Sequence, residues 1–199
     1  MASTSVRSAG PAAQPGGPPR PPLLTVGTVV WLASELMFFS GLFAAYFTLR
    51  AASPGPWPPE GVHLETGMAA LFTALLVASS GTIQLGVKAL GRGDRDGFRR
   101  WTTATVLLAA AFLANQAREW GAAGFGVDDH AFGSSFFVLT GFHALHVTGG
   151  VVAMLVLLGR AASPRFGREE VPAAEVVSYY WHFVDVVWIG MFATLFLMP

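Results

Sequence analysis

The chain has 199 residues, of which 53% are hydrophobic and only 12% are charged, and its formal net charge is zero. Soluble domains carry about 25% charged residues, so this composition cannot cover a water-facing surface and indicates an integral membrane protein. The absence of a basic excess argues against a nucleic-acid partner. Cysteine is absent, which excludes disulfides, iron–sulfur clusters, Cys-ligated zinc and a thiolate copper centre within this chain.

The N-terminal segment is rich in proline, glycine, alanine and serine and poor in large apolar side chains. Such a segment buries too little apolar surface to fold, so residues 1–22 are predicted to form a disordered cytoplasmic tail. It also lacks the apolar core of a signal peptide. Residues 23–199 are predicted to form one membrane domain.

Five stretches of this domain are long and apolar enough to cross about 30 Å of hydrocarbon as helices. Short segments rich in proline, glycine and charged residues separate them. The predicted spans are residues 23–49, 65–91, 99–121, 133–159 and 174–198. The predicted fold class is therefore an all-α integral membrane bundle of five transmembrane helices.

The basic residues predict how these spans are oriented. With a cytoplasmic N-terminus, ten of the twelve basic residues lie inside, because only Arg50 and Arg118 fall in segments outside. This distribution obeys the positive-inside rule. An odd number of spans then places the C-terminus on the outside.

Several ionisable residues lie inside the predicted spans. Such a residue at the membrane centre costs about 2.5–3.5 kcal/mol, so it needs an internal partner or a function. The first span contains Glu35, the fourth contains His143 and His146, and the fifth contains His182 and Asp185. The three-residue spacing of the two pairs places each pair on one helix face. We expect one interhelical polar layer that faces the bundle interior.

Other side chains in the spans have simpler interpretations. Gln116 and Glu119 are further polar residues toward the outer end of the third span. Arg160 closes the fourth span on the cytoplasmic side, where its guanidinium either reaches a phospholipid phosphate or only fixes the topology. Trp181 and Trp188 lie too deep for an interfacial aromatic belt and are expected to pack inside the bundle.

The polar layer has three interpretations, of which hydrogen-bonded pairing between helices is favoured. A haem held by two histidines needs ligands on different helices, whereas His143 and His146 share one helix. A copper or zinc site has no dedicated spacing motif here. Proton conduction through Glu35 remains open as well, although no span carries a ladder of polar groups from side to side.

Four blocks resemble subunit III of the haem-copper oxidases (cytochrome c oxidase subunit 3): WLASELMFFSGLFAAYF (31–47), FLANQAREW (112–120), FFVLTGFHALHVTGG (136–150) and YYWHFVDVVWIGMF (179–192). The last two blocks are highly specific. The family has a seven-helix form and a five-helix bacterial form, and this chain is similar to the shorter one. The lipid-holding cleft opened by the two extra helices is then expected to be absent or completed by another subunit.

This resemblance implies a subunit without a catalytic role in a proton-pumping oxidase that reduces O2 to water in the bacterial plasma membrane. The implied partners are the catalytic subunit I, subunit II and membrane lipids, and a respiratory supercomplex is left open. Haems and copper are expected in the partner subunits and no cofactor in this chain, apart from a phospholipid. Arg160 matches a lipid headgroup contact of the family.

The resemblance also implies roles for the polar residues. Glu35 and His143 match a glutamate and a histidine that pair between helices in the family. His146, His182 and Asp185 match the remaining polar positions of the two specific blocks. The implied role of these residues is to stabilise the core and support proton uptake.

Alternatives stay open at this point. The electron donor docks on other subunits, so a quinol oxidase or a relative associated with nitric oxide reductase is not excluded. The proline-rich tail and the predominance of arginine over lysine favour an actinobacterial cytochrome c oxidase. From different classes, the chain could be a free-standing membrane transporter or a haem-binding membrane protein.

Overall fold

The computed structural model describes residues 23–198, so the predicted tail 1–22 and the C-terminal Pro199 lie outside the described residues. The described chain is helical, with short connections. The long helices are α1 (Leu23–Ala52), α2 (Thr66–Gly91), α3 (Arg95–Ala122), α4 (Ala131–Arg160) and α5 (Val171–Phe192). The 3₁₀ helix η1 (Arg168–Glu170) precedes α5, and the π-helical turn η2 (Ala193–Leu197) follows it.

Four helical stretches of the described chain are long and apolar enough to cross a membrane. They are Leu23–Ala52, Thr66–Gly91, Ala131–Arg160 and Arg168–Leu197. Helix α3 is equally long, but its charge-free part, residues 101–117, also contains Asn115 and Gln116. The structure therefore confirms an all-helical fold with four membrane-length apolar helices, and the predicted third span remains a prediction.

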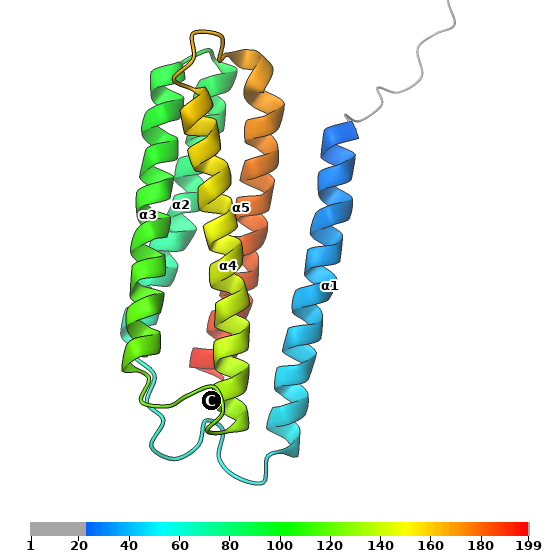
Figure 1. Ribbon diagram of the computed structural model, residues 1–199, viewed down its shortest axis with the longest axis vertical. Coiled ribbons are helices and arrows are strands. Elements are labelled where there is room, and N and C mark those ends of the chain that lie inside the picture. Colours follow the sequence, from blue (N-terminus) through cyan, green and yellow to red (C-terminus); the bar gives the residue numbers. More distant parts are fainter. Residues whose placement is uncertain (1–22, 199) are drawn as a thin grey trace, which may run out of the picture.

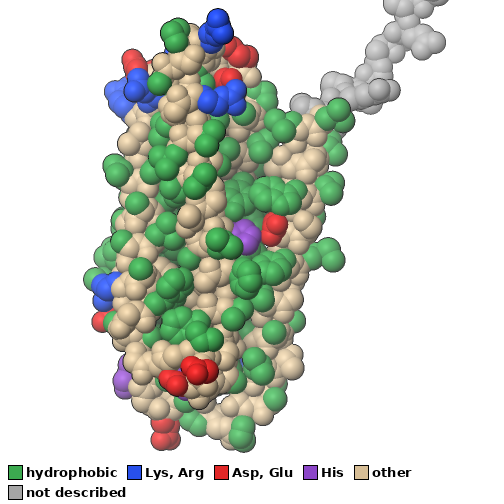
Figure 2. Space-filling view, in the orientation of Figure 1, with side chains coloured by type: hydrophobic (Ala, Val, Ile, Leu, Met, Phe, Trp, Pro, Cys, Tyr) green, Lys and Arg blue, Asp and Glu red, His purple; other side chains and the backbone are tan. Residues whose placement is uncertain are grey.

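Helices α2 to α5 form a bundle, and α1 lies beside it against α4 and α5 (Figure 1). Helix α2 contacts α3 and α5, while α4 contacts both α3 and α5. The α2–α3 and α4–α5 connections lie at one end of the molecule, and the α1–α2 and α3–α4 connections lie at the other with the C-terminus. Lys and Arg side chains gather at the first of these ends (Figure 2).

Side-chain caps set where α3 and α4 begin. The Asp94 carboxylate accepts a 2.7 Å hydrogen bond from the backbone N–H of Gly97, and His130 Nδ1 accepts one of the same length from Gly133. Gly93 makes the preceding turn with a φ of 84°, a conformation that disfavours a side chain. A capping side chain supplies a partner to an N–H group that the helix itself leaves unpaired. The polar residues of the two loops therefore determine where α3 and α4 begin, through hydrogen bonds made within each loop.

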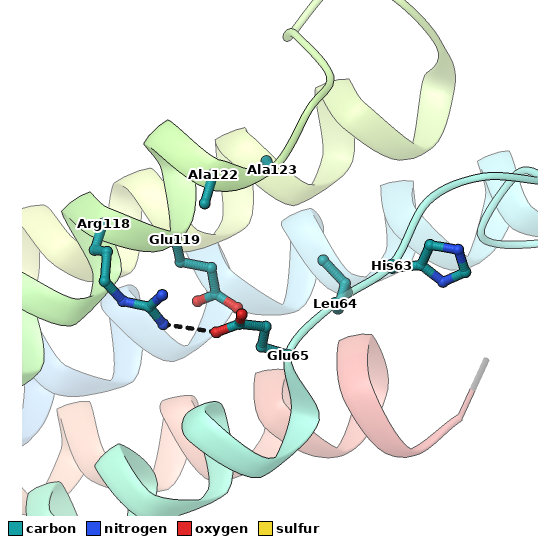
Figure 3. Close-up of a pocket in the computed structure, with 7 residues that line it drawn as sticks. All are labelled: His63, Leu64, Glu65, Arg118, Glu119, Ala122 and Ala123. Atoms are coloured by element: carbon teal, nitrogen blue, oxygen red, sulfur yellow. Dashed lines mark hydrogen bonds and ion pairs between the residues drawn. The ribbon is translucent and has the colours of Figure 1, made fainter.

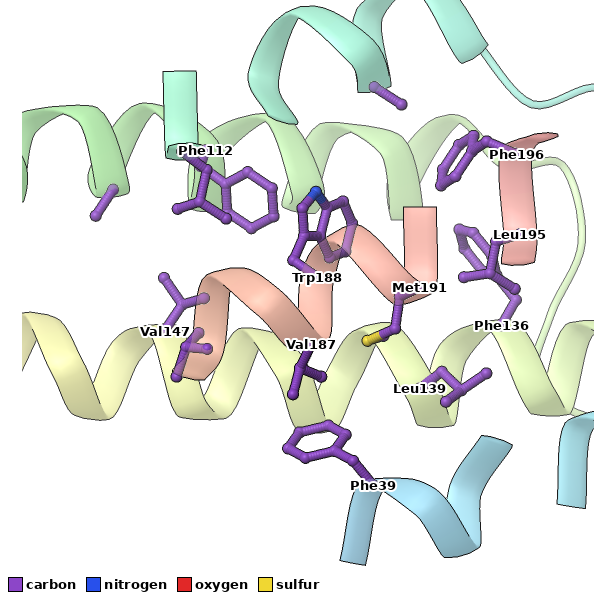
Figure 4. Packing of buried hydrophobic residues seen from close by; sticks show 14 of the residues in the cluster. Phe39, Phe112, Phe136, Leu139, Val147, Val187, Trp188, Met191, Leu195 and Phe196 are labelled. Carbon is purple, nitrogen blue, oxygen red and sulfur yellow. The ribbon is translucent and has the colours of Figure 1, made fainter. Parts of the chain in front are cut away.

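Aromatic residues fill the centre of the bundle (Figure 4). Trp181 is 0% exposed and Trp188 is 2% exposed, so the expectation that both indoles pack inside is confirmed. Their Nε1 groups donate to the hydroxyls of Ser79, at 2.8 Å, and Thr73, at 2.9 Å, both on α2. The two indoles therefore join α5 to α2 by packing and by hydrogen bonds that a lipid environment cannot replace.

Helix α1 is attached by a narrow stripe of side chains. Its buried residues are Thr28, Phe39 and Tyr46. The Tyr46 hydroxyl donates to the carbonyl of Thr194 at 3.3 Å, and Arg50 donates to the carbonyl of Met198 at 2.8 Å. The remaining faces of α1 are largely exposed, so its position depends on few contacts.

Close packing of α4 against α5 leaves no room for a side chain at Gly150. A Cβ at Gly150 would lie 2.6 Å from the Trp181 ring and 3.3 Å from the Tyr180 ring. We expect Gly150→Ala to lower the free energy of unfolding in detergent by about 1–3 kcal/mol, because a rigid buried ring must move. Gly141→Ala on the same helix is the control, since its Cβ would meet nothing within 4 Å. Equal stability of the two variants would contradict the packing described.

Candidate functional site

One interhelical contact joins α1 to α4 inside the span. Glu35 Oε2 lies 3.2 Å from His146 Nε2, and the two side chains are 22% and 14% exposed. His146 Nδ1 lies 2.7 Å from the carbonyl oxygen of Phe142, which can only accept. Nδ1 must therefore carry a hydrogen, and the contact at Nε2 needs one further proton on either the imidazole or the carboxyl. In both cases the pair is neutral overall, which suits a membrane interior.

Aromatic rings surround this pair and hold it in place. Phe39 meets the His146 ring edge to face with centroids 4.9 Å apart, and Trp31 stacks on Tyr180 at 5.2 Å. The Tyr180 hydroxyl donates to the backbone carbonyl of His146 at 2.9 Å. Figure 2 shows an acidic side chain beside a histidine on the face where α1 meets the bundle. The pair is thus fixed from α1, α4 and α5.

The other histidine of α4 has a different environment. His143 is fully buried, stacked on Trp188 at 4.8 Å and edge-on to Phe112 at 5.8 Å. Neither of its ring nitrogens hydrogen-bonds to a described residue. The structure therefore differs from the pairing of Glu35 with His143 that the resemblance implies, because His143 faces α3 and α5 while His146 faces α1.

A second polar cluster joins α2 to α5. The Ser80 hydroxyl donates to Asp185 Oδ2 and lies 2.8 Å from His182 Nδ1. Because a hydroxyl has one hydrogen, Ser80 must accept from Nδ1–H of His182 while it donates to the carboxylate. The Ser178 hydroxyl donates to Gln84 Oε1 at 3.2 Å, and its oxygen lies 3.3 Å from His182 Nε2. His182 therefore contacts one hydroxyl from α2 and one from its own helix.

The expected single polar layer is therefore divided into separate parts. The α1–α4 pair and the α2–α5 cluster each join two helices, and no hydrogen bond found among residues 23–198 links them. The sequence analysis did not anticipate Ser80, which lies between His182 and Asp185. The available signal was a hydroxyl on a neighbouring span opposite two unpaired polar groups.

Polar residues at the C-terminal end of α3 line a cavity of about 190 Å³. Arg118 and Glu65 form a 2.8 Å ion pair across it, and the Glu119 carboxylate points toward that of Glu65 (Figure 3). Glu119 and Gln116 are 8% and 2% exposed. Glu65 was not anticipated as the partner of Arg118, because it is the first residue of its predicted span.

Arg160 also has a partner within the chain. Its guanidinium donates to Glu170 at 2.5 Å, which ties the end of α4 to the 3₁₀ turn before α5. The side chain of Arg160 is 54% exposed. The guanidinium expected at a lipid phosphate is thus engaged by a carboxylate of the same chain.

The described residues do not present a metal-binding constellation. Within 23–198, no three or more His, Asp or Glu side chains are grouped closely enough to hold a metal ion. Glu35 contacts His146 across a helix boundary, and Ser80 does the same with His182 and Asp185. This arrangement, with four membrane-length apolar helices, defines a multi-pass membrane protein whose intramembrane polar groups join helices.

Comparison with known proteins identifies the family. Residues 22–198 match the family described as cytochrome c oxidase subunit III. The chain is 51% identical over 180 residues to a probable cytochrome c oxidase subunit 3 of Nocardia farcinica, and 49% identical over 182 residues to cytochrome c oxidase subunit 3 of Corynebacterium diphtheriae. It is 36% identical over 179 residues to the same subunit of Thermostichus vulcanus. Each alignment covers 89% of both chains. The chain belongs to the cytochrome c oxidase subunit III family.

A double-mutant cycle distinguishes the two histidines as partners of Glu35. We expect Glu35→Ala and His146→Ala to show a coupling of about 0.5–2 kcal/mol in unfolding free energy, the range measured for hydrogen bonds between membrane helices. Glu35→Ala and His143→Ala should be additive within about 0.5 kcal/mol. Coupling to His143 in place of His146 would refute the contact between α1 and α4.

A serine substitution tests the second cluster. Ser80→Ala removes the hydroxyl shared by His182 and Asp185 and should destabilise the chain by about 1–3 kcal/mol, because a buried carboxylate oxygen loses its donor. Ser40→Ala is the matched control, since the Ser40 hydroxyl is exposed and bonds only to its own helix. It should change stability by less than about 0.5 kcal/mol. Chemical unfolding in detergent measures both, and a Ser80→Ala effect as small as the control would argue against the cluster.

Proposed function

We propose that this chain is the non-redox subunit III of a cytochrome c oxidase, assembled with the catalytic subunit I and with subunit II. Its family membership carries the proposal. The relatives named above are called subunits of cytochrome c oxidase, which favours cytochrome c over quinol as the electron donor of the assembled enzyme. The contribution proposed for this chain is to stabilise the catalytic core of a proton-pumping oxidase that reduces O2 to water.

The proposed placement is in a bacterial plasma membrane, with five spans, a cytoplasmic N-terminus and an external C-terminus. Helix α3 is proposed as the third span because it runs alongside α2 and α4 over a comparable length. The Arg118–Glu65 ion pair supports this placement, since it satisfies a charge near one end of α3. The basic residues at the α2–α3 and α4–α5 connections support the orientation.

The proposed chain holds no haem or copper of its own, and these belong to the partner subunits. Support comes from the polar side chains themselves: Glu35, His146, His182 and Asp185 are all engaged with neighbours in the same chain. Support for proton uptake by the assembled oxidase is proposed to follow from the rigidity that these contacts give.

Purification in mild detergent tests the proposal. A tagged copy should retain a haem-copper core in stoichiometric amount, and the assembled enzyme with Glu35→Ala should lose activity faster during turnover while its initial rate changes little. The reason is that a loosened α1 weakens the assembly and leaves the chemistry in subunit I intact. Ser40→Ala provides the control for both measurements.

Two outcomes would contradict the proposal. A stoichiometric Soret band from the isolated chain would assign a haem to it and favour a haem-binding membrane protein. Recovery of the chain without any haem-copper partner, under conditions in which the other oxidase subunits remain together, would favour a free-standing protein.

A further inference from the structure

The basic end of α3 carries two adjacent arginines on its exposed face. Arg160 is paired with Glu170, and Arg168 donates to the backbone carbonyl of Arg92 at 2.9 Å. Arg99 and Arg100 are adjacent, exposed and form no ion pair within residues 23–198. Two guanidinium groups therefore lie near Asp96 on one surface of α3, without an ion pair among the described residues.

These arginines line a depression on the outward face of α3. The depression is shallow and widely open, and its lining comes from one helix face. Its lining residues are Asp96, Arg99, Arg100, Thr103, Ala104 and Leu107. A neighbouring hollow of about 310 Å³ is lined by Arg100, Trp101 and Ala104. Both hollows meet at Arg100.

The lining changes character along the helix axis. The charged residues lie at the end of α3 that begins at Arg95. Leu107, which is 65% exposed, lies about 12 Å beyond Arg99 along the helix axis at 1.5 Å per residue. Trp101 is 39% exposed and lies between the two regions. A polar part followed by an apolar part over this distance matches a phospholipid headgroup followed by the start of its acyl chains.

The charge of the depression selects among lipids. Two arginines and Asp96 give a net charge of +1, which complements the single negative charge of a phosphodiester. The guanidinium groups and the Thr103 hydroxyl can donate to phosphate oxygens, and the indole of Trp101 suits the interface depth. A zwitterionic lipid would bring a cationic group toward two arginines and lose this advantage.

We propose that the outward face of α3 at its basic end binds one anionic phospholipid, with the phosphate at Arg99 and Arg100 and an acyl chain along Leu107. The proposal rests on the proposed function in one respect, namely that α3 spans the membrane with this end at the cytoplasmic leaflet. It places on α3 a contact with a lipid headgroup, which the resemblance implied for Arg160.

Quenching of Trp101 by brominated lipids tests the site in the full chain reconstituted into vesicles. The signal of Trp101 is the difference between the wild type and Trp101→Phe. Brominated phosphatidylglycerol should quench this signal at a lower mole fraction than brominated phosphatidylcholine. Each arginine should contribute roughly five-fold to the preference, so Arg99→Gln with Arg100→Gln should reduce it about 25-fold.

Two further variants control this experiment. Arg95→Gln with Arg165→Gln removes two basic residues at the same end and should reduce the preference much less than the loss of Arg99 and Arg100, because neither lines the depression. Arg99→Lys with Arg100→Lys keeps the charge and should retain a large part of the preference. If that pair folds and shows no preference, or if the glutamine pair keeps the full preference, the site is overturned.

Inorganic phosphate separates a lipid from a free anion as the ligand. Phosphate at millimolar concentration should not reverse the quenching, because it lacks the acyl chain that Leu107 contacts. Reversal would overturn the lipid in favour of a soluble anion. Co-purification with a haem-copper core is measured separately, so loss of the lipid preference with intact assembly would refute this site alone.

Discussion

Hydrocarbon offers no hydrogen-bond partner, so a polar side chain in a span is stabilised when it meets one inside the protein. This constraint decides how the helices of the present chain meet. The carboxyl of Glu35 reaches His146 on α4, and the hydroxyl of Ser80 reaches two polar groups of α5. Without a hydrophobic force between helices in lipid, such contacts and close packing fix the arrangement.

Helix α1 shows this dependence most clearly. It lies beside the α2–α5 bundle with only Thr28, Phe39 and Tyr46 buried, and most of its surface is available to lipid or to another subunit. The neutral pair of Glu35 and His146 lies within its narrow contact stripe. A subunit that must keep a stable shape beside a catalytic partner would depend on this pair more than its small area suggests.

The helices themselves were predictable from the sequence. The five predicted helical stretches overlap α1 to α5, with ends that differ by up to four residues, except that α5 ends at Phe192 and continues as η2. Apolar length and breakers are local properties of a chain. The π-helical turn after Phe192 was not anticipated, since it continues the apolar pattern of α5. The sequence also placed Trp181 and Trp188 correctly inside the bundle.

The partners of the polar residues were much less predictable. His143 and His146 are separated by only about 60° around their helix, so a small rotation of α4 decides which of them meets Glu35. Ser80 and Glu65 became partners only through the way in which α2 lies against α5 and α3. Arg160 met Glu170 because the loop after α4 folds back. Such choices depend on the assembled bundle and leave no local signal.

The most direct test concerns the position of α1. The chain contains no cysteine, so Val30→Cys on α1 and Val156→Cys on α4 give unique, exposed sites for spin labels. Pulsed electron paramagnetic resonance in lipid then measures the distribution of distances between α1 and α4. We expect a single narrow distribution in the otherwise unaltered chain and a markedly broader one with Glu35→Ala. Equal widths in the two proteins would show that the intramembrane pair does not hold α1 in place.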